Sequence, residues 1–502
     1  MSRIVNALRQ HARSRADSVA LEDETGTLTF AELDAAVERA SHVLLDAAPK
    51  AIGLLADNGR AWVIADLAAQ KAGLCIVPLP LFMSTPQIAH AIRAAGIDYV
   101  VTDQPERIEA VLRTPSMRAD PFCNGLSVIR IVPGPVSAKI SAQVHKITFT
   151  SGTTGEPKGV CLDIESLANT AIALCVASAA SDRDRHLCVL PLATLLENIG
   201  GIYAPILAGA TICVPRLASV GLSGSSGLDV ATLLAALSRW RATSAILVPQ
   251  MAQAIVAACR AGAPVPTTLR YVAVGGAPVP MILLNQARAL GLPLHEGYGL
   301  SECASVVALN RLGADRIGSV GQPLPHIRIE FAADSEVLVG GVRWFGYLGD
   351  GSVPDRDDAC IATGDLGYLD PDGYLYLSGR KKNMFVTSFG RNVAPEWVER
   401  ELMAQPPIAQ AAIFGEARPF NTAVIVPRAN ATDSDIAAAI ETANQDLPDY
   451  ARVRAWIRTS VPFSATNAMA TPNGRFRRST IYSTYSAQID AHYKDHSPIG
   501  AA

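Results

Sequence analysis

A strand-prone run that ends in a glycine- and hydroxyl-rich segment most constrains what this chain can fold into. The run covers Ile147 to Thr150, and it is followed by Ser151, Gly152, Thr153, Thr154, Gly155 and Lys158. Glycines let a backbone approach a ligand closely, and hydroxyls, N–H groups and a lysine suit phosphate. The segment predicts a phosphate-binding loop that includes Thr150, although a flexible surface turn uses similar residues. It does not match G-x-x-x-x-G-K-[ST], because Gly159 follows Lys158.

Length and composition predict a multidomain globular protein. The chain has 502 residues, 49% of them hydrophobic and 18% charged, and its net charge is −3. That charge gives no reason to expect nucleic acid or an anionic membrane as the partner. We expect no signal peptide and no transmembrane segment. The nine cysteines occur singly and without a C-x-x-C pair, which indicates reduced, mostly buried thiols in a cytoplasmic protein rather than a zinc site.

Apolar strands alternate with amphipathic helices over the first 300 residues. This alternation predicts parallel sheets covered by helices; the expected strands include 52–55, 75–79, 99–102, 245–248 and 271–274, and the expected helices 60–72 and 86–95. Residues 103–145 are expected to be a variable, Pro-containing connection that leads to the loop. The strand at 271–274 runs into Gly275, Gly276 and Ala277, where the backbone could approach a ligand at the carboxyl end of the sheet. From about residue 313 the pattern becomes mainly β, and the last 120 or so residues are expected to form an α+β unit.

Four further segments accompany the loop in a fixed order. They read EGYGLSE at 296–302, TGDLG at 363–367, GRKK at 379–382 and GRNVAPE at 390–396. With the loop they resemble the acyl- and aryl-adenylating enzymes, the superfamily of acyl-CoA synthetases, peptide-synthetase adenylation domains and luciferases. The resemblance implies an α/β domain with a small distorted β-barrel over residues 1–379. It also implies a mobile α+β lid domain over residues 380–502.

The resemblance also implies roles for single residues. Glu302 would hold Mg²⁺, which often takes one protein carboxylate together with phosphates and waters. Asp365 would accept both ribose hydroxyls, Arg380 would help to hold ribose and phosphate, and Lys382 would be the hinge of the lid domain. The remaining nucleotide- or thiol-facing positions are Gly297, Tyr298, Gly299, Ser301 and Gly390, with Tyr298 stacking on adenine.

Each of these residues also has an ordinary structural interpretation. Glu302 could be a surface glutamate, Tyr298 a core tyrosine and Asp365 a turn-capping residue. Lys382 could be a charged linker residue with no special role.

Two departures from the family pattern bear on the reaction. Arg475 stands where the family usually has a lysine that bridges the acid and the α-phosphate, and arginine is longer and planar. Arg477 or Arg478 could share its work. Thr194 stands where many relatives have a histidine or an aromatic residue. The expected acid pocket contains Thr194, Asn198 and Gly275.

The segment 194–200 is mostly apolar, which favours an apolar acid, with a fatty acid first, over an amino acid; its spacing also suits ordinary core. The sequence therefore predicts ATP- and Mg²⁺-dependent activation of a carboxylic acid followed by transfer to CoA. Transfer to a carrier-protein thiol or to an amine is the first alternative. A nucleotide- or adenylate-binding protein with weak or no catalysis is the second.

Overall fold

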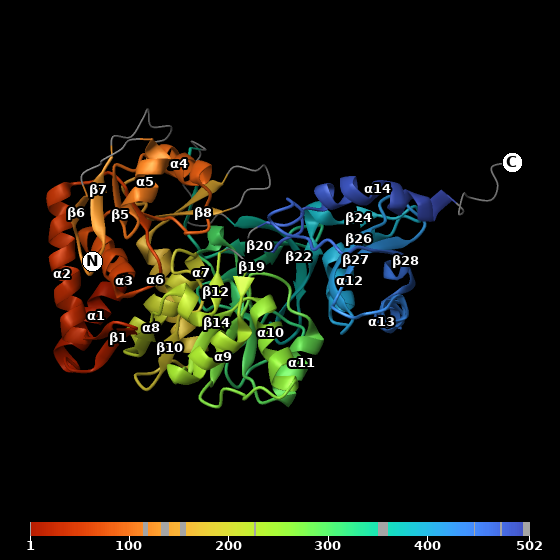
Figure 1. The fold of residues 1–502 in the computed structure, drawn as a ribbon, viewed down its shortest axis with the longest axis horizontal. Helices are drawn as coiled ribbons and strands as arrows, with labels where there is room; N and C mark the ends of the chain where they lie inside the picture. The colour runs from red at the N-terminus through yellow and green to blue at the C-terminus, as the bar shows by residue number, and fades with distance from the viewer. Residues whose placement is uncertain are drawn as a thin grey trace.

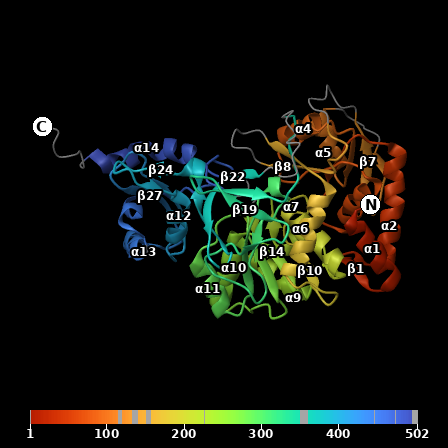
Figure 2. The same cartoon turned by 180° about the vertical axis from the view of Figure 1, so that it is seen from behind.

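The structure is a computed structural model that describes residues 2–113, 119–131, 140–150, 157–224, 227–349, 360–445, 447–471 and 474–494. The chain passes from a large N-terminal part, which holds two sheets and their helices, to a smaller C-terminal part at the opposite end (Figures 1 and 2). The predicted loop residues Ser151, Gly152, Thr153, Thr154 and Gly155 lie outside the described residues. Their role stays a prediction.

The first sheet has a parallel centre, as the alternating pattern predicts. The described strands run in the order β21-β9-β8-β4-β3-β5-β7-β6, and β3, β4, β5 and β8 are parallel to their neighbours within this group. Their bounds are β3 Ile52–Leu55, β4 Ile76–Pro78, β5 Tyr99–Thr102, β6 Ala119–Pro121, β7 Ser127–Arg130, β8 Lys146–Thr150, β9 Lys158–Leu162 and β21 Trp344–Tyr347. Every residue of β3 is buried, because helices cover both faces of a parallel sheet.

The predicted connection over residues 103–145 includes regular elements. This stretch contains α5 (Pro105–Leu112) and the strands β6 and β7. β7 pairs antiparallel with β5, and β6 pairs with β7. These short strands are ordered by pairing with a sheet edge that already exists. Such a tertiary contribution leaves little trace in local sequence.

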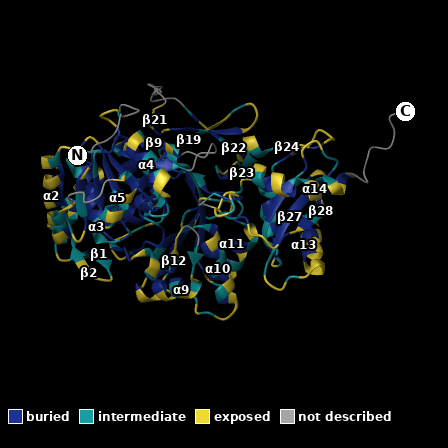
Figure 3. Ribbon diagram, turned by 45° about the horizontal axis from the view of Figure 1, so that its top comes forward, coloured by how far each residue is buried: buried dark blue, intermediate teal, exposed yellow. Residues whose placement is uncertain are grey.

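The second sheet carries the strand ends that later form the site. Its described strands run in the order β18-β17-β16-β15-β14-β10-β11-β1-β2, and the run from β16 to β1 is parallel. The bounds are β1 Val19–Asp23, β2 Gly26–Thr29, β10 Arg185–Leu187, β11 Thr211–Cys213, β14 Ser244–Leu247, β15 Tyr271–Val274, β16 Leu294–Tyr298, β17 Ala308–Leu309 and β18 Gln322–Pro323. Figure 3 shows the strands of this part largely buried and the outer faces of its helices exposed.

Helices pack on these sheets in the alternating order that the sequence predicts. Their bounds are α1 Arg3–Ser14, α2 Phe30–Ala47, α3 Arg60–Ala72, α4 Thr85–Ala94, α6 Ile164–Ala177, α7 Leu195–Glu197, α8 Ala204–Ala208, α9 Val230–Arg239, α10 Pro249–Arg260 and α11 Met281–Ala289. A short π-helix, Asn198–Tyr203, joins α7 to α8. Within the described part of the chain, no helix is both long and apolar enough to cross a membrane.

A smaller antiparallel sheet follows, which agrees with the β pattern expected after residue 313. Its order is β19-β20-β22-β23, and the bounds are β19 Arg328–Phe331, β20 Glu336–Gly340, β22 Ile361–Leu369 and β23 Leu375–Arg380. β22 and β23 place Asp365 opposite Arg380. This sheet therefore joins two of the predicted site motifs in register.

Residues from Phe385 onward have hydrophobic clusters of their own, which are made only of residues between Phe385 and Tyr493. The elements are β24 Phe385–Val386, β25 Asn392–Val393, α12 Pro395–Met403, β26 Ile408–Phe414, β27 Asn421–Pro427, α13 Asp433–Gln445, β28 Val453–Arg458 and α14 Arg478–Lys494. Separate cores support a two-domain division, and the boundary at residues 379 and 380 stays a proposal. β23 itself runs through that boundary to Arg380.

Candidate active site

Thr150 and Lys158 face each other at the two ends of the predicted phosphate loop. β8 ends at Thr150, β9 begins at Lys158, and the two residues are partners in an antiparallel ladder. The Thr150 hydroxyl donates to the carbonyl oxygen of Lys158 at 3.5 Å. The loop is therefore the connection of a β-hairpin, and the hairpin holds a hydroxyl and an exposed lysine beside it.

Tyr347 links Lys158 to the predicted metal ligand Glu302. The Lys158 ammonium lies 4.9 Å from the centre of the Tyr347 ring, and the Tyr347 hydroxyl donates to Glu302 Oε1 at 2.8 Å. β21, which ends at Tyr347, pairs with β9, and Glu302 lies in the 3₁₀ turn Ser301–Cys303. The sequence analysis did not identify Tyr347. In the sequence, a site tyrosine within an aromatic strand looks the same as a tyrosine of the hydrophobic core.

Asp365 lies between Tyr298 and Arg380. The Tyr298 hydroxyl donates to Asp365 Oδ2 at 2.6 Å, and Arg380 Nε lies 2.5 Å from Asp365 Oδ1. Burial raises the pKa of Asp365, while Arg380 and Tyr298 act in the opposite direction. A carboxylate has about four acceptor positions, so two remain for ribose hydroxyls. Stacking of Tyr298 on adenine stays a prediction. The Tyr298 hydroxyl is bound to Asp365, which is the residue predicted to bind ribose.

The glycines at the carboxyl ends of β15 and β16 serve two different purposes. A Cβ at Gly275 would lie 2.9 Å from the carbonyl oxygen of Gly297, so the adjacent strand ends touch through backbone. A Cβ at Gly299 would lie 1.7 Å from the Ser305 carbonyl oxygen, so this glycine makes room for the protein's own chain. Gly276, at φ +87°, borders open space, and Ala277 follows it. Gly276 is therefore the position here with room for a ligand.

Arg475 reaches this site from the C-terminal part of the chain. Protein atoms crowd its guanidinium and lower its pKa first, Arg380 lowers it further, and Asp365, Glu302 and Tyr298 raise it. The residue nevertheless keeps an exposed surface. The loop before it packs close to α10, because a Cβ at Gly474 would lie 3.2 Å from Gln250 Nε2. The arginine therefore stands within electrostatic reach of both candidate site carboxylates, Asp365 and Glu302.

The junction between the two parts is rich in charge. Lys381 pairs with Asp334 at 2.6 Å and Glu336 at 2.9 Å, which holds the end of β23 to the small sheet. Lys382 is the next residue, and its pKa is lowered by burial and by Arg380 and Arg475. The predicted hinge therefore begins where the anchored segment ends. Its role stays a prediction.

A buried glutamate in the second sheet is within electrostatic range of the C-terminal part. Burial raises the pKa of Glu296, at the end of the second sheet, to about 8. The positive charge of Arg400, which lies on α12 of the C-terminal part, acts against this rise.

Comparison with known sequences identifies the family. The AMP-binding enzyme profile matches residues 8–343, and the profile of the AMP-binding enzyme C-terminal domain matches residues 382–497. The chain belongs to the AMP-binding enzyme family. It is therefore an enzyme of the adenylating class that the sequence motifs resemble.

Relatives within the AMP-binding family include ligases for different acids. The chain is 27% identical to a long-chain-fatty-acid–CoA ligase, FadD15, of Mycobacterium bovis, and the match covers 86% of each chain. It is 28% identical to a feruloyl-CoA synthase of an Amycolatopsis species over 83% of this chain and 87% of that one. At this identity the relatives do not single out one acid.

Solved structures of AMP-binding enzymes have the same fold. The anthranilate CoA ligase AuaEII, in complex with anthranoyl-AMP, aligns over 98% of both chains with a TM-score of 0.80 and 18% identity. The o-succinylbenzoate CoA synthetase of Bacillus subtilis with ATP and magnesium aligns over 92% of this chain and 97% of that one, with a TM-score of 0.72 and 23% identity. The amide bond synthetase McbA of Marinactinospora thermotolerans aligns over 96% and 99%, with a TM-score of 0.77 and 23% identity.

The two side chains predicted to line an acid pocket in this AMP-binding enzyme, those of Thr194 and Asn198, differ in burial and in hydrogen-bond partners. Thr194 is half-buried, and its hydroxyl donates to the Pro191 carbonyl oxygen at 2.6 Å. The Asn198 side chain is buried, and its Oδ1 accepts from Lys146 Nζ at 2.5 Å. Lys146 also binds Asp66 at 2.6 Å and Tyr203 at 2.7 Å. The amide of Asn198 thus belongs to a buried ionic network, and its acid-binding role stays a prediction.

The remaining predicted residues lie at the C-terminal end of this AMP-binding enzyme. Arg478 donates to both carboxylate oxygens of Glu399 at 2.5 and 2.6 Å, so its guanidinium is held inside the C-terminal part. Arg477 is exposed. Gly390, at φ +70°, forms the exposed turn between β24 and β25. Arg475 is therefore the arginine of this trio whose charge reaches Glu302 and Asp365.

Proposed function

We propose that this AMP-binding enzyme is an ATP-dependent acid–thiol ligase that makes an acyl-adenylate and passes the acyl group to CoA. One observation carries the proposal: Lys158, Glu302, Asp365 and Arg475 come from four distant segments and meet at one place. Transfer of AMP needs cations for the phosphates, a carboxylate for a metal and a carboxylate for ribose. The meeting of these four residues supports that reaction.

In the proposed first step, a carboxylate oxygen of the acid attacks the α-phosphorus of ATP, and the bond to pyrophosphate breaks. Lys158 and Arg475 would offset the negative charge on the phosphoryl oxygens, and Asp365 would orient the ribose. Glu302, a half-buried carboxylate held by Tyr347, suits Mg²⁺, which would supply further charge neutralisation. In the second step, the sulfur of CoA attacks the acyl carbon, its proton passes to solvent, and AMP leaves.

An apolar acid, with a fatty acid first, is our proposed substrate class. Leu195 and Ile199 are buried beside the half-buried Thr194, and the polar neighbour Asn198 is engaged with Lys146. Both observations favour an apolar chain over an ammonium group near this segment. One named relative acts on long-chain fatty acids and another makes feruloyl-CoA, so the test includes both aliphatic and aromatic acids.

The test is acid-dependent pyrophosphate release with ATP and Mg²⁺, measured with and without CoA over short- to long-chain fatty acids and aryl acids. We expect release with an apolar acid and an acyl-CoA product. Absence of release with every acid, while ATP still binds, would contradict catalysis and favour a nucleotide-binding protein. In that case Arg475 is the first residue to change to lysine.

The acceptor is tested in the same assay. An amine acceptor has one observation in its favour, the similarity of fold to an amide bond synthetase. Pyrophosphate release without CoA consumption would overturn the CoA proposal. Adding a phosphopantetheinylated carrier protein, or a panel of amines, would then identify the acceptor from the mass of the product.

A further inference from the structure

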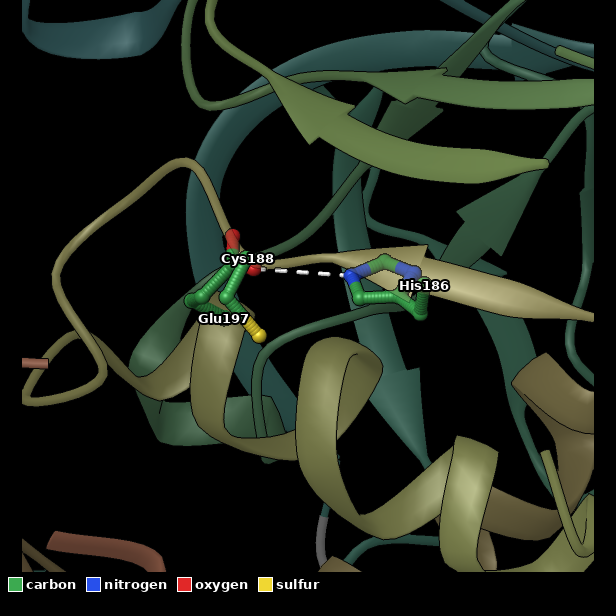
Figure 4. Close-up of side chains that lie close together, drawn as sticks. All are labelled: His186, Cys188 and Glu197. Atoms are coloured by element: carbon green, nitrogen blue, oxygen red, sulfur yellow. Dashed lines mark ion pairs between the residues drawn. The ribbon is translucent and has the colours of Figure 1, made fainter. Parts of the chain in front are cut away.

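Three side chains with metal-binding atoms converge beside β10. His186 lies on β10, Cys188 follows that strand, and Glu197 ends α7. Figure 4 shows the three side chains close together, with the imidazole directed at the carboxylate. His186 Nε2 lies 3.5 Å from Glu197 Oε1, and the three ligand atoms all lie within 4.8 Å of one another. The described residues thus hold a buried His–Cys–Glu cluster.

Three polar atoms of this cluster, both Glu197 oxygens and His186 Nε2, are buried without a hydrogen bond of ordinary geometry to any described residue. His186 is 4% exposed, and Cys188 and Glu197 are 0% exposed. A buried carboxylate that lacks partners is strongly unfavourable, so native proteins pair such groups or bind metal with them. The unpartnered atoms therefore point to a ligand.

Gly201 packs directly against the cluster. A Cβ at Gly201 would lie 2.7 Å from Glu197 Oε1, 3.1 Å from His186 Nε2 and 3.2 Å from Cys188 Sγ. All three ligand atoms therefore face Gly201, and a side chain at this position would crowd them. Two ligands about 2.0–2.1 Å from one tetrahedral ion are roughly 3.3 Å apart, close to the 3.5 Å between His186 Nε2 and Glu197 Oε1.

Donor chemistry and charge select the ion. Thiolate, imidazole and carboxylate are the ligands that Zn²⁺ takes in proteins. One thiolate, one carboxylate and one neutral imidazole balance a charge of +2, which suits a dry interior. His186 Nδ1 lies 3.0 Å from Ser244 Oγ, and such a bond to the second nitrogen orients a ligating histidine.

We propose that His186, Cys188 and Glu197 bind one Zn²⁺ ion. The ion would tie β10 to the start of the π-helix and so hold the Thr194 segment in place. The expectation that the cysteines bind no zinc depended on the absence of clustered cysteines in the sequence. Here the fold adds Glu197 to the pair His186 and Cys188.

The experiment measures zinc per chain in the full-length protein, purified without chelator from zinc-supplemented cells. We expect about one equivalent. Replacement of zinc by Co²⁺ is expected to give a thiolate-to-cobalt charge-transfer band, which a magnesium site without sulfur cannot give. A wild-type protein that holds no zinc and shows no such band on Co²⁺ addition would overturn the proposal.

Matched variants locate the ion. Cys188→Ser removes the thiolate, and Gly201→Ala keeps all three ligands but adds a methyl group within 3.2 Å of each ligand atom; both are expected to lose the metal and the band. Cys259→Ser is the control, because Cys259 is also buried and its thiol also donates to a backbone carbonyl, 3.8 Å away against 3.7 Å for Cys188. Metal retained in both Cys188→Ser and Gly201→Ala would overturn the assignment.

A measurement on the wild-type protein alone covers the case in which the variants do not fold. Removal of zinc by a strong chelator is expected to lower Tm by several degrees, and added Zn²⁺ is expected to restore it, because the ion binds only the folded state. A Tm that does not respond to zinc removal would contradict a metal that joins these elements.

Discussion

At the residue scale, Tyr347 holds together two groups of opposite charge. Its ring faces the Lys158 ammonium at 4.9 Å, and its hydroxyl donates to Glu302 at 2.8 Å. A metal ligand oriented by a neighbouring hydrogen bond loses affinity when that bond is removed. Tyr347 therefore positions Glu302 without a direct role in the proposed chemistry.

Tyr347→Phe keeps the ring and removes the hydroxyl. We expect the Mg²⁺ concentration for half-maximal pyrophosphate release to rise about 10-fold, with a smaller change at saturating Mg²⁺. The measurement is a Mg²⁺ titration at fixed ATP and acid. Tyr368→Phe is the control, because Tyr368 is an exposed tyrosine stacked on Tyr376. An unchanged Mg²⁺ requirement would contradict the positioning role.

Arg475 supplies the second residue-scale prediction. Its charge acts on Asp365 and Glu302 from the C-terminal part of the chain. Arg475→Ala is expected to lower the rate of adenylate formation about 100-fold, because a preorganised cation near the phosphoryl group is lost. Arg475→Lys keeps the charge and is expected to retain most of the rate.

The half-reactions separate this role from general damage. Thioester formation from supplied acyl-adenylate should be little affected by Arg475→Ala. Equal losses in both half-reactions would indicate a role in folding or in docking of the C-terminal part instead.

At the element scale, Glu399 joins three elements of the C-terminal part. It lies on α12, accepts from the Ile413 amide of β26 at 2.8 Å, and accepts from Arg478 at the start of α14 at 2.5 and 2.6 Å. Burial raises its pKa to about 7, although Arg478 acts to lower it. The protonated form is therefore favoured more in the folded than in the unfolded chain.

Stability should depend on pH through this residue with a defined sign. The unfolded pKa is 4.5 and the folded pKa about 7, so the stabilising contribution is complete below pH 4.5 and is lost as pH rises through 7. Over that window the free energy of unfolding of the wild type, relative to Glu399→Gln, is expected to fall by about 3 kcal/mol.

Urea unfolding of the two proteins at a series of pH values measures this difference. The exposed Glu441 of α13 provides the control variant, Glu441→Gln, which should follow the wild type. A difference that stays constant with pH, or grows as pH rises, would show that Glu399 is not protonated in the folded state.

At the scale of the whole molecule, the charged junction bears on the predicted rotation of the C-terminal part. Lys381 is anchored to Asp334 and Glu336, so rotation about Lys382 would leave the small sheet in place. The charge of Arg475 acts on Asp365 and Glu302, the predicted nucleotide and metal ligands. The exposed turn at Gly390 would need such a rotation to take part in thiol transfer.

Lys382→Pro tests the hinge, because proline fixes φ and restricts the residue before it. Adenylate formation should stay within about 3-fold of wild type, while thioester formation should fall at least about 10-fold. Lys382→Ala, which keeps backbone freedom, should retain both. The two half-reactions are measured by pyrophosphate release and by acyl-CoA formation; equal loss of both in Lys382→Pro would contradict the hinge.

Much of this protein was predictable from local sequence. The parallel alternation and the helix Arg60–Ala72 follow from periodicity, which reflects contact with a core. Motif spacing indicated the family and the residues Glu302, Asp365 and Arg475. Periodicity and motifs can be recognised in the sequence because each depends on residues that are close together along the chain.

Tertiary structure alone decided the rest. The pairing of β7 with β5, the contact of Tyr347 with Glu302, and the burial of Asn198 against Lys146 join segments that are far apart in sequence. The cluster of His186, Cys188 and Glu197 also depends on the turn from β10 into the π-helix. The sequence by itself determined the family and most of the helices and strands of the parallel sheets. The fold determined which side chains meet, because those contacts depend on packing between segments rather than on residue order.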